Sequence, residues 1–242
     1  TTFWADTWAD ILQAIGLDPS AGGFVRDLGF QIEREYTPLI HFLPIDLGYL
    51  IGLGIIIGIL AELYCKYVLR MQRLGNKWFK NKLVLRMVIC GSILGLIYSF
   101  LPDMYHSLEG MQKLIVKGDT TIFSAIITFV ILFITTGLAA ASGAPGGLFF
   151  PMLTLGGAIG LACGNWVEIL TGHVPSTYVF AGMGAFISAC SRTPITAMFL
   201  AFALTKNLII LKPVLISCIT SFLIARLFNE KSIYERQIQI EI

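Results

Sequence analysis

The stretch Ser142–Pro151, with the sequence SGAPGGLFFP, separates two long apolar runs and contains three glycines and two prolines. Glycine and proline interrupt regular helices. Inside a lipid bilayer, an interrupted backbone is stable only where protein or a water-filled cavity satisfies its polar groups. If the chain spans a membrane, this stretch is therefore either an intramembrane site or a plain loop between two spans.

The composition indicates a membrane protein. The chain is 56% hydrophobic and 13% charged, with a mean hydropathy of +0.78, whereas soluble domains carry about 25% charged residues. Several apolar runs approach the roughly 20 residues that cross a bilayer, and others are shorter and interrupted by glycine or proline, as in transporters with discontinuous helices. A large soluble helical protein is disfavoured because too few polar helix faces exist to contact water.

These runs predict an all-α fold, namely a polytopic membrane helical bundle with broken and re-entrant helices. Residues 46–242 form the transmembrane part, and residues 1–45 form an N-terminal interfacial or loop segment. The expected helices are Asp46–Tyr67, Lys82–Leu101, Asp119–Ala141, Gly146–Leu170, a pair broken near Arg192–Pro194, and Leu211–Phe228.

Glycines spaced four residues apart predict close helix–helix contacts. The spacing occurs at Gly54 and Gly58, at Gly91 and Gly95, and at Gly156, Gly160 and Gly164.

The charged residues and the potential metal ligands argue against nucleic-acid binding, a metal site and an enzyme. Seven cations crowd the short linker that joins the first two expected helices and the adjoining helix ends, at Lys66, Arg70, Arg73, Lys77, Lys80, Lys82 and Arg86. The positive-inside rule places this segment in the cytoplasm, and its position between two spans disfavours nucleic acid as a partner. The five cysteines show no metal-ligand spacing, and His41, His106 and His173 are scattered, so we expect neither a metal site nor an enzyme.

A helix that begins at Gly147 or Leu148 would present its first free N–H groups at the break. The aligned peptide dipoles place about half a positive charge at such an end, which attracts anions. No acidic side chain occurs between Ser142 and Pro151. The residues therefore favour an intramembrane anion site over a metal-cation site.

The same stretch resembles the CLC family of chloride channels and chloride/proton antiporters. The family's G-x-F-x-P element is matched by Gly147, Leu148, Phe149, Phe150 and Pro151. The resemblance extends from about Leu47 to Tyr234 and includes AGMGAFISACSRTPITAMFLAFALT and the tail SIYERQ, but no match is evident before residue 45.

The resemblance implies that the amides of Leu148 and Phe149, next to Gly147, face a dehydrated chloride ion. It also implies that the hydroxyl of Tyr234 donates a hydrogen bond to that ion. Chloride would be the transported ligand, with no cofactor. The protein would be a channel or an antiporter, homodimeric when complete, in the lipid bilayer of a bacterial inner membrane.

Two family elements are absent from the sequence. Neither the serine-bearing G-S-G-I-P loop nor the G-K/R-E-G-P loop with the gating glutamate occurs, and Ala203 stands where many members have an acid. We therefore expect the chain to represent the C-terminal half, which is the second of two inverted repeats. Another inverted-repeat anion carrier and a non-transporting membrane subunit remain as alternatives.

The cytoplasmic side of the basic segment is directly testable. We expect a cysteine introduced at Asn81, in a background without native cysteines, to resist a membrane-impermeant thiol reagent added outside intact cells. The same cysteine should react once the cells are permeabilised. Rapid labelling from outside would contradict the orientation.

Overall fold

The computed structural model describes residues 46–79, 83–102, 122–143, 146–171, 176–205 and 208–241, and every regular element within these ranges is a helix. The all-α prediction is thus confirmed for the described part of the chain. The expected N-terminal segment 1–45 lies outside the described residues, as do the three histidines and Asp119.

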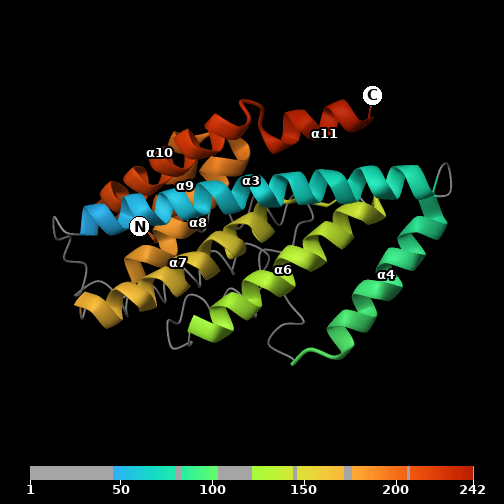
Figure 1. Cartoon of the computed structure of the whole chain (residues 1–242), viewed down its shortest axis with the longest axis horizontal. Helices are drawn as coiled ribbons and strands as arrows, with labels where there is room; N and C mark the ends of the chain where they lie inside the picture. Colours follow the sequence, from blue (N-terminus) through green and yellow to red (C-terminus); the bar gives the residue numbers. More distant parts are fainter. Residues whose placement is uncertain are drawn as a thin grey trace, which may run out of the picture.

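The described helices are shown in chain order in Figure 1. They are α3 (Asp46–Trp78), α4 (Leu83–Ser99), α6 (Ile122–Ser142), α7 (Phe149–Thr171), α8 (Ser176–Ser191), α9 (Pro194–Thr205), α10 (Leu211–Phe228) and α11 (Ile233–Glu241), with a 3₁₀ turn at Leu208–Ile210. The longest helix, α3, packs against α6, α8 and α10, α7 packs on α8, and α4 packs mainly on α6.

In the part of the chain that the structure describes, four segments are long and apolar enough to cross a membrane. They are Leu47–Trp78, Ile122–Ser142, Phe149–Leu170 and Leu211–Gln239, and three shorter apolar helices accompany them at Leu83–Ser99, Thr177–Ser191 and Pro194–Thr205. The mixture of full spans and short helices fits a polytopic membrane protein with interrupted helices.

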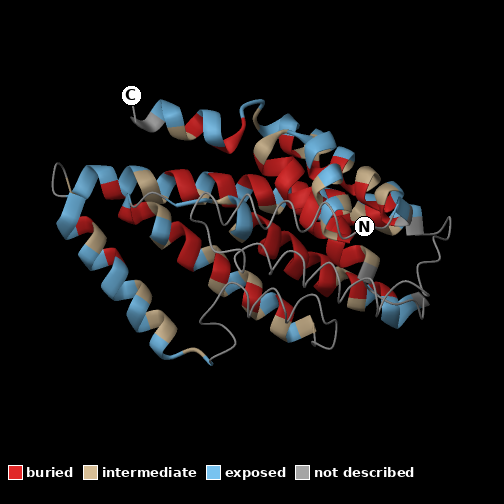
Figure 2. Ribbon diagram, turned by 180° about the vertical axis from the view of Figure 1, so that it is seen from behind, coloured by how far each residue is buried: buried red, intermediate tan, exposed pale blue. Residues whose placement is uncertain are grey.

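The core lies where α3, α7 and α8 meet, and most of α4 is exposed (Figure 2). Tyr64 is fully buried, with its ring edge-on to Phe133 and Phe186 at centroid distances of 5.6 Å. Aromatic edge-to-face contacts of this kind stabilise a core beyond simple burial.

Two of the three predicted glycine patterns are contact sites. A Cβ on Gly156 or Gly160 would collide with the backbone of α8 at Gly182 and Tyr178, and a Cβ on Gly54 or Gly58 would collide with α10. The pattern at Gly91 and Gly95 was interpreted wrongly, because a Cβ there would meet nothing within 4 Å among the described residues. The reason is that α4 diverges from the bundle beyond its contact with α6.

Serine hydroxyls join the same helices across these close contacts. Ser188 donates to the carbonyl of Cys218 at 2.8 Å, Ser221 donates to the carbonyl of Ala185 at 2.8 Å, and Ser217 donates to the carbonyl of Leu50 at 3.2 Å. Small polar residues at membrane helix interfaces stabilise association by such bonds.

Several predicted boundaries were wrong. The first helix does not end at Tyr67 but continues to Trp78, so Lys66, Arg70, Arg73 and Lys77 lie on α3 and not in a loop. No proline interrupts the segment after Tyr67, and its single glycine, Gly75, is tolerated within the helix, so its basic composition indicates the edge of a membrane and not the end of a helix. The α10 prediction, Leu211–Phe228, is confirmed at both ends.

The close contact between α7 and α8 gives a stability prediction. We expect Gly160→Ala to lower the free energy of unfolding by about 1–3 kcal/mol, because the new methyl group overlaps the Tyr178 carbonyl. Gly95→Ala, on the open face of α4, is the matched control and should leave stability unchanged or slightly raised. Thermal unfolding in detergent measures both, and equal melting temperatures would contradict the packing.

Candidate functional site

The start of α7 carries free backbone donors. The helix begins at Phe149, and its first backbone hydrogen bond runs from the N–H of Met152 to the carbonyl of Leu148 at 3.0 Å. Pro151 has no N–H. The amides of Leu148, Phe149 and Phe150 therefore precede the helical ladder, and the positive end of the helix dipole coincides with them.

A cavity of about 980 Å³ opens at this helix end. We call it the α7 cavity. Its lining comes from α3, α4, α6, α7 and α11, and includes Gly147, Leu148 and Pro151 at the helix start, Thr135 and Thr136 on α6, and Gln237 on α11. No aspartate or glutamate is among the described residues that line it, so no fixed negative charge opposes an anion there.

Arg86, one of the seven cations that the sequence analysis grouped together, lines the α7 cavity. It is 6% exposed on α4, where its Nε donates to the carbonyl of Ala141 and its Nη1 donates to Oδ1 of Asn76. Gly75 and Gly143, the latter at φ +72°, leave room for the guanidinium. Arg86 thus neutralises the negative end of α6 and adds positive charge to the cavity.

The structure brings together two of the four predicted site residues, because Gly147 and Leu148 both line the α7 cavity. Phe149 is 36% exposed and packs edge-on against Phe150, outside that lining. Tyr234 is 42% exposed and does not line the cavity either. Its helix nevertheless reaches the cavity through Gln237, so α7 and α11 both contribute to the cavity lining.

A buried cluster of charges fixes α11 against the rest of the protein. Glu62 on α3 is 2% exposed and accepts two hydrogen bonds of 2.9 Å from Arg236 on α11. The same carboxylate accepts a hydrogen bond of 3.1 Å from Arg192. We call these three residues the Glu62 clamp.

Arg192 occupies the break between α8 and α9 with φ at +63°, a left-handed conformation that is unusual for a residue other than glycine. Its guanidinium also donates to the carbonyls of Ala225 at 3.0 Å and Asn229 at 2.8 Å. The bonds to α3 and to the end of α10 hold this strained residue in place. The predicted break near Arg192–Pro194 is confirmed, and α9 begins at Pro194.

The sequence analysis did not single out the Glu62 clamp. A signal was present, because Glu62 is the only acidic residue between Asp46 and Asp103 and lies within an apolar run. Ionisable residues inside membrane segments are rare and are normally paired. The two arginine partners are distant in sequence, so only the fold identifies them.

No group of three or more potential His, Cys, Asp or Glu metal ligands occurs among the described residues. The arrangement at the α7 cavity instead combines the amides at the start of α7 with the guanidinium of Arg86, and both kinds of group are hydrogen-bond donors. The hydroxyls of Thr135 and Thr136 donate to carbonyls of their own helix.

The Glu62 clamp predicts that neutralising the single carboxylate of Glu62 strongly lowers the stability of the fold. We expect Glu62→Gln to lower the free energy of unfolding by about 3–5 kcal/mol, because it leaves two buried arginines without a counter-charge. Glu168→Gln, at an exposed position on α7, is the matched control and should have little effect. Unfolding in detergent measures both, and equal stability of the two variants would show that the clamp does not hold the fold.

Comparison with known proteins places these features in a family. The model of the family described as voltage gated chloride channel matches residues 15–226. The match begins inside segment 1–45, where the sequence pattern alone showed no resemblance, and it ends before Tyr234.

The chain is similar to curated transporters and to solved structures. It is 34% identical over 191 residues to the H(+)/Cl(-) exchange transporter ClcA of Vibrio parahaemolyticus, covering 76% of this chain and 41% of that protein. It is 30% identical over 225 residues to ClcA of Salmonella arizonae, covering 88% of this chain and 48% of that protein. The chain thus spans less than half the length of these relatives.

Two solved structures share the fold. A slow cyanobacterial Cl⁻/H⁺ antiporter superposes with a TM-score of 0.74 at 24% identity, over 84% of this chain and 48% of that chain. A eukaryotic CLC transporter superposes with a TM-score of 0.66 at 22% identity, over 84% and 36% of the two chains. With the family match, the apolar helices and the interrupted α8–α9 pair, these likenesses identify the chain as a member of the voltage-gated chloride channel (CLC) family, and hence as part of a multi-pass integral membrane protein.

Proposed function

We propose that the protein to which this chain belongs transports chloride across a membrane, and that the chain contributes one wall of the anion path. The observation that carries the proposal is the N-terminus of α7, whose first amides precede the helical ladder beside a cavity with no carboxylate among its described lining residues. Relatives named as H⁺/Cl⁻ exchange transporters support chloride as the ion.

The chemistry of the α7 cavity suits a dehydrated anion. A chloride ion that leaves water needs hydrogen-bond donors in place of its hydration shell, since an unsatisfied charge in a low dielectric is costly. The amides of Leu148 and Phe149 would donate to it beside Gly147, and the half-charge of the helix end and the guanidinium of Arg86 would attract it. Tyr234 on α11 would donate a hydrogen bond from its hydroxyl to the ion.

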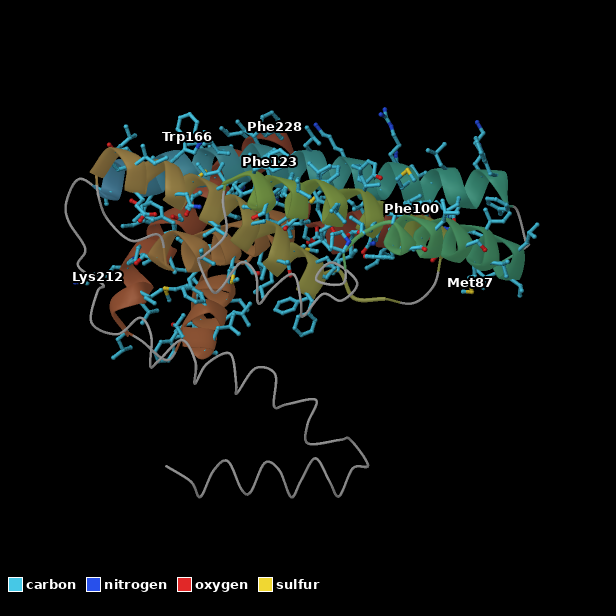
Figure 3. The ribbon with its side chains drawn as sticks, turned by 90° about the horizontal axis from the view of Figure 1, so that it is seen from below. Met87, Phe100, Phe123, Trp166, Lys212 and Phe228 are labelled. Atoms are coloured by element: carbon cyan, nitrogen blue, oxygen red, sulfur yellow. The ribbon has the colours of Figure 1, made fainter. Side chains whose placement is uncertain are left out.

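The chain covers less than half the length of its relatives, so the remaining walls of the path would come from other parts of the complete protein. Exposed apolar residues on α4, such as Val84 at 75% and Leu96 at 63%, offer a surface for them. Phe100, which follows α4 and is 84% exposed, extends this surface and is labelled in Figure 3.

The complete protein would be a homodimer in a bacterial inner membrane. Apolar side chains at helical spacing support a second contact surface, with Ile195 and Phe199 exposed on α9 and Ile219, Leu223 and Leu227 exposed on α10. The protein would need no cofactor and catalyse no covalent chemistry, with chloride as its only transported ligand.

A charge placed at the α7 end tests this function. A Cβ on Gly147 would meet nothing within 4 Å, so longer side chains fit there without steric strain. We expect Gly147→Glu to abolish chloride efflux from liposomes that contain the complete protein, because a fixed carboxylate repels the anion from the free amides.

Gly147→Gln, which has nearly the same shape without the charge, is the matched control and should lose much less flux. If the two variants lost the same flux, size and not charge would be responsible. If Gly147→Glu transported chloride like the unmodified protein, the anion path would lie elsewhere.

A further inference from the structure

A second groove, of about 740 Å³, runs along the C-terminal part of α3 beside α11. We call it the basic groove. Five of its lining residues are cations, namely Lys66, Arg70, Arg73 and Lys77 of α3 and Arg236 of α11. No acidic residue is among the described residues that line it, and the α7 cavity is a separate space.

The four cations of α3 form one stripe. Their spacing of four, three and four residues keeps them within about 60° around the helix axis, because each residue advances an α-helix by about 100°. All four are exposed, and none forms an ion pair with another residue in the described ranges. Side chains that end in nitrogen project outward from α3 in Figure 3.

The inner side of the basic groove is also positive. Arg236 shares the single carboxylate of Glu62 with Arg192, so the Glu62 clamp carries one uncompensated positive charge. The Nε–H group of Arg236 is buried and has no hydrogen-bond partner in the described structure. The ammonium of Lys66 lies over the ring of Phe228, 5.6 Å from its centroid, in a cation–π contact.

The groove lies where a membrane headgroup layer is expected. The apolar run of α3 extends from Leu47 to Cys65, about the length that crosses a bilayer, and the first cation follows directly. Leu63 is 53% exposed and Leu74 is 41% exposed, and both line the groove together with the cations. Trp78, at 77% exposure, ends the helix as interfacial aromatic residues do.

A ligand that fits this surface carries negative charge and an apolar tail together. A small soluble anion would bind the cations but would not account for the exposed leucines in the same groove. A nucleic acid would not reach a groove at the membrane boundary. We propose that the basic groove binds the phosphate of an anionic phospholipid headgroup, with an acyl chain along Leu63. The proposal does not depend on chloride transport, because the groove and the α7 cavity use different residues apart from their shared helices.

A binding titration of the complete protein in neutral detergent tests the groove. The probes are short-chain phosphatidylglycerol, short-chain phosphatidylcholine and inorganic phosphate. Calorimetry measures the affinity of the protein for each of them. We expect saturable binding of phosphatidylglycerol only. Equal binding of phosphatidylcholine would overturn the role of charge, and inorganic phosphate that bound as tightly would make this a soluble-anion site.

The variant Arg70→Gln/Arg73→Gln should weaken phosphatidylglycerol binding by about thirtyfold, since each cation near the headgroup contributes about fivefold. The matched control is Lys212→Gln/Lys231→Gln, which removes two exposed cations that do not line the groove. Figure 3 shows Lys212 at the end of the molecule opposite Met87. The control should bind phosphatidylglycerol like the unmodified protein.

The charge-preserving variant Arg70→Lys/Arg73→Lys separates binding from folding. It should keep most of the affinity, while both arginine variants should unfold at the temperature of the unmodified protein. An equal loss of affinity in the groove variant and the control would refute the site, as would unchanged affinity in Arg70→Gln/Arg73→Gln.

Discussion

The Glu62 carboxylate is the point on which the arrangement of four helices depends. It lies in an apolar span, and its bonds to Arg192 and Arg236 join α3 to the α8–α9 break and to α11. Arg192 extends the connection to the last turn of α10 through the carbonyls of Ala225 and Asn229. A buried carboxylate is stable only when paired, and a left-handed arginine persists only when its surroundings hold it, so each feature requires the other.

This constraint also connects structure to function. Arg236 lies two residues from Tyr234 and one residue from Gln237, which lines the α7 cavity. The clamp therefore fixes the position of α11 relative to the free amides at the start of α7. Because Arg236 also lines the basic groove, one side chain adjoins both the membrane headgroup layer and the helix that would complete the anion site.

Backbone contact without side chains is the second constraint. Gly156, Gly160 and Gly182 let α7 and α8 approach until their backbones touch, and Gly54 and Gly58 do the same for α3 and α10. In lipid, helix association relies on packing and on interhelical hydrogen bonds, because the acyl chains are as apolar as leucine. The N-terminal turn of α7 lies at the cavity, and Pro151 in that turn has no N–H to donate.

The local patterns that predicted structure correctly are those with a local cause. Pro194 starts a helix because its ring fixes φ and lacks an N–H, and the ends of α10 follow from its apolar run. The boundary at Tyr67 failed because charge marks where water begins and does not by itself stop a helix that no proline interrupts. Gly91 and Gly95 failed because spacing alone does not show that a partner helix is present.

The sequence by itself determined the membrane class, the broken helix at Ser142–Pro151 and the absence of acidic residues there, since composition and backbone chemistry are local properties. Only the tertiary structure decided that Arg86 is buried against the end of α6, that Glu62 is shared by two arginines, and that Gln237 and not Tyr234 lines the α7 cavity. Those contacts join residues 55 to 174 positions apart. Their pairing follows from how the helices pack and not from any spacing along the chain.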